Sequence, residues 1–231
     1  MKNQLSGSSK DIEKRNKKFN IAFIHSPDPN YADTQNYGAQ FMPVWAYTLA
    51  SHIPNETKYE LALFDTRFQN LDSITKADVY LFSGMNQDCG SIQKVHSFLK
   101  LRFPSAISII GGPICWSFDQ ANSLNQLNGF DHIFIGDAED HIDILINNIY
   151  RNRPIEKIIR AQKRFNIKDA REFYRPMLDQ TVGRYYGAVL EVSRGCPFLC
   201  EFCDIRILKD NNRPHNKSIE LIVSELDHLS N

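Results

Sequence analysis

The chain lacks the features that mark membrane, secreted and strongly charged proteins. Its 231 residues contain no apolar stretch approaching the roughly 18 residues that a bilayer-spanning helix needs. Lys plus Arg and Asp plus Glu both number 27, so net charge gives no argument for nucleic acid or an anionic membrane as a partner. Residues 1–18 are polar and Lys-rich without the apolar core of a signal peptide, and we expect them to form a disordered tail.

Cysteine is also scarce, and its odd count of 5 argues against a set of disulfides. We therefore expect a cytoplasmic protein with reduced thiols. Three of the five lie within one short run, Cys196-Pro-Phe-Leu-Cys200-Glu-Phe-Cys203. Cys89 and Cys115 stand apart from it, and we expect them to be buried or neutral thiols.

The spacing of the three clustered thiols leaves a zinc site as an alternative to an iron-sulfur site. His215 lies downstream and would supply a fourth zinc ligand. Structural zinc motifs usually present two C-x2-C pairs separated by a longer loop, whereas this run has one such pair with a third Cys ahead of it. Iron-sulfur clusters are normally held by four Cys thiolates, so three would leave one iron open to another ligand.

Short apolar segments alternate with helix-length segments over residues 19–150, and this pattern predicts a parallel sheet with helices on both faces. The predicted fold is an α/β flavodoxin-like, doubly wound domain. The expected strands are 21–25, 60–65, 78–83, 106–110 and 132–135. The expected helices are 43–53, 91–103 and 138–150.

The rest of the chain divides into two parts. Residues 151–186 lack clear periodicity and are predicted to be a linker with one helix over 168–174. In residues 187–231, Ala188–Val192 is predicted to be a buried strand that turns through Ser193-Arg194-Gly195 into the Cys run. Ser218 is predicted to cap a helix that buries an apolar stripe formed by Ile219, Ile222, Val223, Leu226 and Leu229.

Polar and Gly-rich residues follow the predicted strands. Because parallel strands end at the same edge of a sheet, a ligand is expected there. The residues concerned are Asp33, Gln35 and Gly38 after the first strand, Ser83, Gly84 and Met85 after the third, Gly111 and Gly112 after the fourth, and Gly136 after the fifth. The plainer interpretation makes the glycines ordinary turns and lets Asp137 and Glu139 stabilise a helix N-terminus. Trp45 and Trp116 are most simply packing residues.

The Cys196, Cys200 and Cys203 run, with an aromatic just before the last Cys, resembles the signature of the radical S-adenosylmethionine (radical SAM) enzymes. The resemblance implies that these thiolates hold a 4Fe-4S cluster whose open iron binds SAM. It also implies that Phe202 packs near the adenine of SAM; packing in a barrel core is the alternative role for this ring. The preceding segment resembles the first strand of a radical SAM barrel, so residues 187–231 are expected to form the first β/α unit of that barrel, left incomplete.

The loops of the first domain resemble the cobalamin-binding pattern D-x-H-x-x-G, S-x-L and G-G. Two positions differ from that pattern, because Gln35 stands where the family has an axial His and Met85 stands where it has Leu. An amide lacks the basic nitrogen that ligates cobalt, so His-on coordination is not expected. Cobalamin domains joined to radical SAM barrels often lack that His. A different nucleotide-like ligand in the same crevice is the alternative.

Together the two resemblances imply a cobalamin-dependent radical SAM enzyme that performs radical carbon chemistry, with methyl transfer as the expected reaction. The expected cofactors are a 4Fe-4S cluster, SAM and cobalamin. The expected partners are a small-molecule substrate, an electron donor such as flavodoxin or ferredoxin, and a separate chain that carries the rest of the barrel. With one barrel unit, the chain is expected to be a fragment that is inactive alone. The alternative is a non-catalytic cobalamin carrier or sensor with a vestigial Cys motif.

Overall fold

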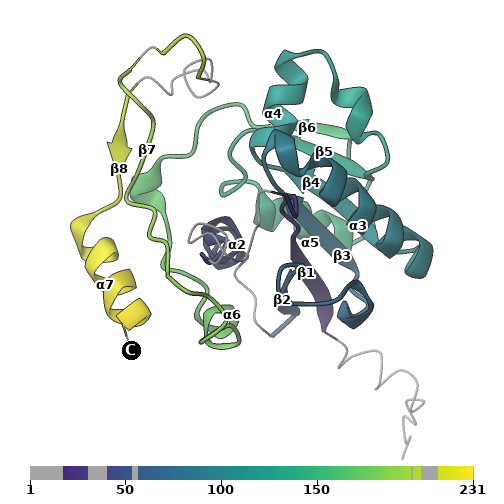
Figure 1. Cartoon of the computed structure of the whole chain (residues 1–231), viewed down its shortest axis with the longest axis horizontal. Helices are drawn as coiled ribbons and strands as arrows, with labels where there is room; N and C mark the ends of the chain where they lie inside the picture. The colour runs from purple at the N-terminus through teal and green to yellow at the C-terminus, as the bar shows by residue number, and fades with distance from the viewer. Residues whose placement is uncertain (1–17, 31–40, 54–56, 199, 204–212, 231) are drawn as a thin grey trace, which may run out of the picture.

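A parallel sheet forms the centre of the molecule. The computed structural model describes residues 18–30, 41–53, 57–198, 200–203 and 213–230. Six strands lie in the order β2-β1-β3-β4-β5-β6, and every pair is parallel (Figure 1). This is the flavodoxin-like strand order extended by one strand. The predicted α/β class is confirmed.

The five predicted strands are all present, with ends within two residues of the predicted ones. The strands are β1 (Phe19–His25), β2 (Tyr59–Asp65), β3 (Val79–Ser83), β4 (Ile107–Gly111), β5 (His132–Ile135) and β6 (Ile158–Arg160). Their side chains alternate between the two faces of the sheet. In β1, Ile21 and Phe23 join the core on one face, and Ala22 and Ile24 join the core on the other.

Helices cover both faces, as a parallel sheet requires. The α-helices are α2 (Val44–Ser51), α3 (Cys89–Arg102), α4 (Pro113–Gln120), α5 (Ile142–Tyr150), α6 (Arg175–Asp179) and α7 (Ile219–Ser230). The short 3-10 segments are η2 (Leu71–Ser73), η3 (Asn86–Asp88), η4 (Leu124–Leu127) and η5 (Ile167–Asp169). The sequence analysis did not predict α4, which begins directly after the Gly111-Gly112 pair with a Pro in its first turn.

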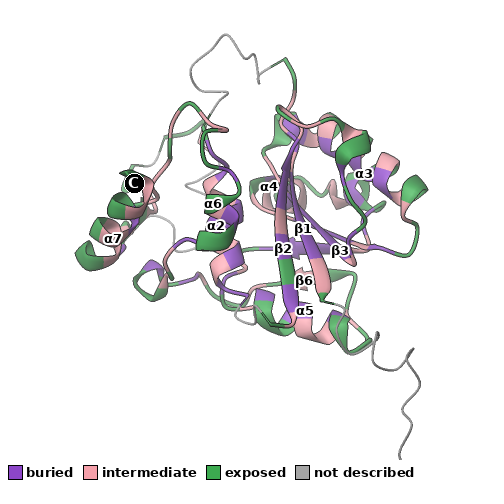
Figure 2. Ribbon diagram, turned by 90° about the horizontal axis from the view of Figure 1, so that it is seen from below, coloured by how far each residue is buried: buried purple, intermediate pink, exposed green. Residues whose placement is uncertain are grey.

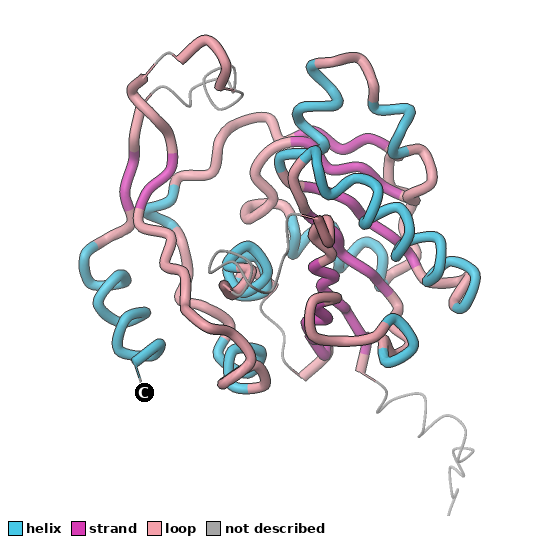
Figure 3. Tube along the Cα trace, in the orientation of Figure 1, coloured by secondary structure: helices cyan, strands magenta, loops and turns pink. Residues whose placement is uncertain are grey.

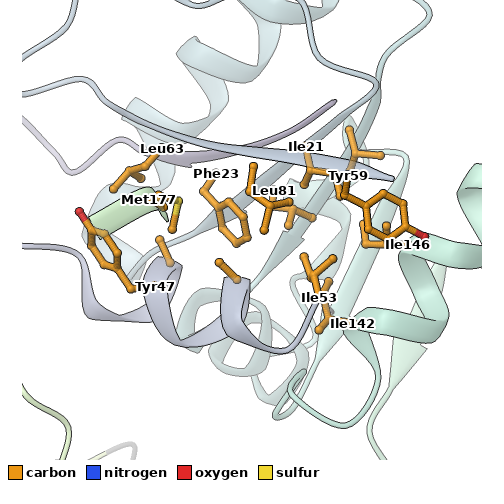
Figure 4. Packing of buried hydrophobic residues seen from close by; sticks show 14 of the residues in the cluster. Ile21, Phe23, Tyr47, Ile53, Tyr59, Leu63, Leu81, Ile142, Ile146 and Met177 are labelled. Atoms are coloured by element: carbon orange, nitrogen blue, oxygen red, sulfur yellow. The ribbon is translucent and has the colours of Figure 1, made fainter. Parts of the chain in front are cut away.

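Two apolar cores hold these layers together. In one of them α2, α5 and α6 pack on the sheet, and Figure 4 shows Tyr47, Ile142 and Met177 grouped with Phe23 and Leu81 of the strands. The other core packs α3 and α4 on the opposite face. Each large side chain that leaves water in this way stabilises the fold by about 1.5–3 kcal/mol. Figure 2 shows this burial concentrated along the central strands.

The segment predicted to be a linker is built into the sheet domain. It adds β6, which pairs with β5 at the sheet edge. It also buries Phe165, Ile167, Phe173 and Met177, each no more than 5 % exposed. The helix predicted over 168–174 is wrong, because residues 170–174 are irregular and lie between the short η5 and α6.

After α6 the chain runs as a loop until it reaches β7 (Ser193–Arg194) (Figure 3). The strand predicted over Ala188–Val192 does not form. The structure instead has a two-residue strand, β7, paired antiparallel with β8 (His215–Asn216). Within the described residues, segment 188–192 belongs to no sheet, and the carbonyl of Val192 accepts a hydrogen bond from the backbone N–H of Lys217 at 3.0 Å.

The C-terminal helix α7 forms where it was predicted, but its buried side differs from the expected one. Ser218 caps it, since its Oγ accepts a hydrogen bond from the backbone N–H of Leu221 at 3.2 Å. In the predicted apolar stripe, Ile219, Val223 and Leu226 are exposed (Figure 2). The fully buried residue of α7 is Glu225, which forms an ion pair with the equally buried Lys217 at 2.7 Å.

Among the helices that the structure describes, none combines the length and the apolar character needed to cross a membrane.

Two buried histidines make the stability of this fold sensitive to acid. Burial lowers the pKa of His52 and of His96 from 6.5 to about 4, and His96 Nε2 lies 3.1 Å from Ser108 Oγ. The unfolded chain takes up protons at these rings at a higher pH than the folded chain does. We therefore expect the free energy of unfolding to be unaffected by them above about pH 6.5 and to fall as the pH drops toward about 4.

Urea unfolding at a series of pH values measures this loss. His52→Gln keeps a side-chain donor but does not titrate, so its unfolding free energy should fall less steeply over the same pH range than that of the parent chain. Equal slopes for the two chains would contradict the assignment to His52.

Candidate functional site

Most of the residues predicted to bind a ligand meet at the carboxyl edge of the sheet. Ser83 and Gly111 are direct neighbours in the register between β3 and β4. Both line a cavity of about 690 Å³, together with Met85, Gly112 and Gly136. A cavity of this size suits a ligand of several hundred daltons. Five of the residues predicted to bind a ligand at this edge thus line one cavity.

The other predicted residues do not line it. Gly84 lies beside the cavity lining, and a Cβ built there would be 2.7 Å from Ile92 Cδ1, so tight packing against α3 explains this glycine. Asp33, Gln35 and Gly38 lie outside the described residues.

The walls of the cavity are largely apolar and aromatic. Trp45 of α2 and Trp116 of α4 line it, although the sequence analysis treated both as packing residues. Other apolar side chains complete the lining: Val44, Leu49, Leu81, Phe82, Ile109, Phe134, Ile142 and Leu145. The signal for the two tryptophans was their closeness in sequence to the loops at this edge.

Two of the edge glycines are required by the backbone. Gly112 has φ +82°, and a Cβ there would lie 2.2 Å from Ser83 Oγ. Gly136 has φ +109°, and its Cβ would lie 2.8 Å from the Cβ of Ala161. L-residues rarely adopt such φ values, so both glycines allow turns that other residues would strain.

Gly111 is different, because nothing among the residues that the structure describes requires a glycine there. A Cβ at this position would meet Phe134 at 3.7 Å or more, which is ordinary contact. The missing side chain therefore leaves room beside the cavity without serving the fold.

One polar group on the cavity wall lacks a partner. Thr48 of α2 is 3 % exposed, and its Oγ1 has no hydrogen-bond partner among the described residues. A buried hydroxyl without a partner costs about 1–3 kcal/mol. The oxygen itself is shielded from solvent, so Thr48 contributes other atoms to the cavity wall.

Asp88 fixes the loops at this edge relative to each other. Its side chain accepts hydrogen bonds from the backbone N–H of Asp28 at 3.0 Å and of Met85 at 2.8 Å. The loops after β1 and β3 therefore share one carboxylate.

The remaining wall comes from the segment that leads into the Cys run. Glu191, Ser193, Arg194 and Gly195 line the cavity on this side. Arg194 forms ion pairs with Glu139 at 2.5 Å and with Glu191 at 2.8 Å.

Asp137 and Glu139, interpreted from the sequence as residues that stabilise a helix N-terminus, belong to this ion-pair group instead. Arg164 Nε donates to Asp137 Oδ2 at 2.6 Å. The contact between Glu139 and Arg194 spans 55 positions, and no local pattern in the sequence indicates it.

The three clustered thiols share the connection between β7 and β8. Cys196 and Cys203 are half-buried and Cys200 is exposed. In the part of the chain that the structure describes, no three His, Cys, Asp or Glu side chains converge to hold a metal ion. His215 Nδ1, the zinc alternative's fourth ligand, accepts a hydrogen bond from the backbone N–H of Ile167 at 3.4 Å.

The remaining predicted residues can be placed as well. Phe202 is 91 % exposed, so its ring is not packed into a core among the described residues. Cys115 is fully buried and Cys89 half-buried, and burial raises the pKa of both thiols. They are therefore neutral thiols apart from the Cys run, as predicted.

Two curated proteins to which this chain is similar are methyltransferases. No family model matches the chain. An uncharacterized methyltransferase from Synechocystis is 26 % identical over 189 residues, which cover 81 % of this chain and 33 % of the relative. The hopanoid C-2 methylase of Rhodopseudomonas palustris is 28 % identical over 209 residues, which cover 83 % of this chain and 35 % of the relative. The curated relatives of this chain are methyltransferases. The chain spans about a third of their length.

A solved structure has a similar fold. TsrM from Kitasatospora setae is a radical S-adenosylmethionine methyltransferase, solved with tryptophan substrate and a SAM analog bound. The TM-score is 0.63 at 14 % identity, over 91 % of this chain and 45 % of that one. At this identity the likeness bears on the fold.

The geometry at Gly112 gives a direct test of the cavity edge. We expect Gly112→Ala to lower the free energy of unfolding by about 1–3 kcal/mol, because it adds a Cβ at positive φ against Ser83. Gly90→Ala is the matched control, since nothing lies within 4 Å of a Cβ there. Gly90 is in α3, so its replacement should leave stability unchanged or raise it by up to about 1 kcal/mol. Chemical denaturation of both variants measures this, and equal effects would contradict the assignment.

Proposed function

We propose that this chain is the cofactor-binding portion of a cobalamin-dependent radical SAM methyltransferase. In this proposal the cavity at the sheet edge holds the nucleotide tail of cobalamin, and Cys196, Cys200 and Cys203 hold a 4Fe-4S cluster that binds SAM. One observation carries the proposal: the cavity is walled on one side by the predicted cobalamin loops and on the other by the segment that enters the Cys run. The two predicted cofactor sites therefore adjoin.

Two features of the cavity support the proposal of a cobalamin tail. There is room beside Gly111, where nothing among the described residues requires a glycine. The aromatic walls at Trp45, Trp116 and Phe134 suit a flat heterocycle.

For the cluster, the support is the chemistry of the donors. Soft thiolates are the ligands that iron-sulfur clusters take, and three of them fall within eight positions here. Cys200 is exposed and Cys196 and Cys203 are partly exposed, unlike the buried Cys115. Phe202, on the same loop, is proposed to contact the adenine of SAM.

When bound, a reduced cluster supplies the electron that cleaves SAM, and methylated cobalamin supplies the methyl group. The residues of this chain would hold both groups and keep water from the apolar cavity. Because the chain spans about a third of its relatives' length, we propose that it does not cleave SAM by itself. The substrate class remains that of a small molecule, and an electron donor such as flavodoxin or ferredoxin is proposed as partner.

Binding of cobalamin tests the cavity assignment. We expect Gly111→Ala to weaken the binding of hydroxocobalamin about tenfold or more, because the added methyl occupies space that the ligand needs, with stability changed by no more than about 0.5 kcal/mol. Equilibrium dialysis against the purified chain measures the Kd, with Gly90→Ala as the control. Unchanged binding by Gly111→Ala would remove the cavity from the cobalamin proposal.

Iron and sulfide content tests the cluster assignment. After anaerobic reconstitution we expect the parent chain to hold about four irons and four sulfides. The triple replacement of Cys196, Cys200 and Cys203 by Ala should hold none, whereas Cys89→Ala should match the parent. Cobalamin binding without iron would favour the carrier or sensor function, and stoichiometric zinc with neither cofactor would exclude both functions.

A further inference from the structure

Arg194 stands at the junction of the cavity and the Cys run. It is the second residue of β7 and lies two positions before Cys196. Its side chain is 16 % exposed and turns back toward the edge of the sheet. Gly195 follows with φ +94°, a conformation that turns the chain sharply into the Cys run.

Three carboxylates surround this guanidinium. Its Nη2 donates to Glu139 at 2.5 Å and to Glu191 Oε2 at 2.9 Å, and its Nε donates to Glu191 Oε1 at 2.8 Å. Asp137 is the third carboxylate, at 3.8 Å from Nη1. Burial alone would lower the pKa of Arg194, but the carboxylates of Glu191 and Glu139 outweigh it and hold the pKa above its ordinary value.

The partners come from two separate parts of the fold. Asp137 and Glu139 lie in the loop between β5 and α5, directly after Gly136 of the cavity edge. Glu191 lies on the same segment as Arg194. The face of the guanidinium also lies 5.7 Å from the ring of Phe165, in the segment after β6. Arg194 thus ties the approach to the Cys run to the loop after β5.

Because carboxylates outnumber cations here, the contact between Arg194 and the loop after β5 is sensitive to the loss of the guanidinium. Asp137 is shared with Arg164, so two cations face three carboxylates. The side chain of Glu139 is 8 % exposed. Without the guanidinium, a nearly buried carboxylate would lose its counter-ion, which is far more costly than the loss of an exposed pair.

The same residues are in contact with whatever fills the cavity. Asp137, Glu139, Glu191 and Arg194 all line it. A ligand seated there would meet the ion-pair group directly and, through it, the start of the Cys run.

We propose that Arg194 is a positioning residue that links ligand binding in the cavity to metal-cluster binding on the Cys196–Cys203 run. The inference rests on the proposed function for its two ligands. In physical terms, the guanidinium of Arg194 holds the start of the Cys196–Cys203 run against the loop after β5. Each cofactor should then change the affinity for the other by the same factor, because such linkage is reciprocal.

The linkage is measured as the ratio of two Kd values of hydroxocobalamin for the whole chain, one without and one with an anaerobically reconstituted cluster. This ratio is the factor by which the cluster changes cobalamin affinity. We expect a cluster to tighten cobalamin binding by about fivefold or more in the parent chain. In Arg194→Gln that factor should fall to one, whatever the change in the separate affinity for each cofactor. Arg194→Lys should restore part of it, since an ammonium keeps the charge but not the fork of donors.

Arg160→Gln is the matched control. Arg160 also forms a two-pronged pair, with Asp119 at 2.5 and 2.7 Å, and neither residue lines the cavity. The Arg160→Gln variant should show the same ratio of hydroxocobalamin Kd values as the parent chain. Two results would overturn the linkage: the same ratio of Kd values in Arg194→Gln as in the parent chain, or a ratio of one in a parent chain that binds both cofactors. Either result would leave the proposed function standing.

Hydrogen exchange on the cofactor-free chain tests the positioning role of Arg194 separately from the proposed function. Arg194→Gln should speed exchange of the amides of residues 193–203 on the order of tenfold, with β3 and β4 unchanged. A parent chain that binds neither cofactor would exclude the proposed function and the linkage, and the exchange result would still decide whether Arg194 holds the loop. Unaltered exchange in Arg194→Gln would show that it does not.

Discussion

Both faces of the parallel sheet must be covered, and this constraint decides where the rest of the structure can place a ligand. Helices α2 and α5 cover one face and α3 and α4 cover the other, and the loops at the carboxyl edge form the cavity together with residues of α2, α4 and α5. Parallel register brings Ser83 beside Gly111, and the positive φ of Gly112 turns the backbone away directly afterwards. The cavity edge is therefore a consequence of strand pairing and of one glycine that nothing else can replace cheaply.

The sheet and the C-terminal segment are held by different forces. Apolar burial is strong but not directional, and it fixes the layers of the sheet domain. The segment after α6 relies on charged contacts: Arg194 with its carboxylates, and the fully buried pair of Lys217 and Glu225. Such pairs add little net stability, because removing their charges from water costs nearly as much as the attraction returns. Their geometric demands are strict, however, so they fix where the chain lies.

Sequence patterns predicted the sheet well because strands β1 to β5 carry continuous apolar runs. They missed β6, where Ile158 is exposed and three residues give no period, and they missed α4 behind the Gly111-Gly112 turn. The loops at the sheet edge were predicted as a site, since parallel topology alone gathers them. The cavity wall formed by Glu191, Ser193, Arg194 and Gly195 was not predicted as part of the site. Its contact with Glu139 depends on the path of a segment whose sequence has no periodicity.

The difference between apolar periodicity and polar contacts that are distant in sequence also explains why the buried side of α7 was predicted wrongly. Its apolar period predicted burial of Ile219, Val223 and Leu226, yet Glu225 is the residue that is fully buried. A helix turns its apolar stripe inward only when an apolar surface is there to receive it, whereas a buried carboxylate must face its counter-ion wherever that lies. Lys217 meets this need at 2.7 Å, and Glu172 adds contacts with Ser224 and His228 of the same helix. Polar contacts therefore set the rotation of α7 among the described residues, just as Arg194 sets the path of the chain into the Cys run.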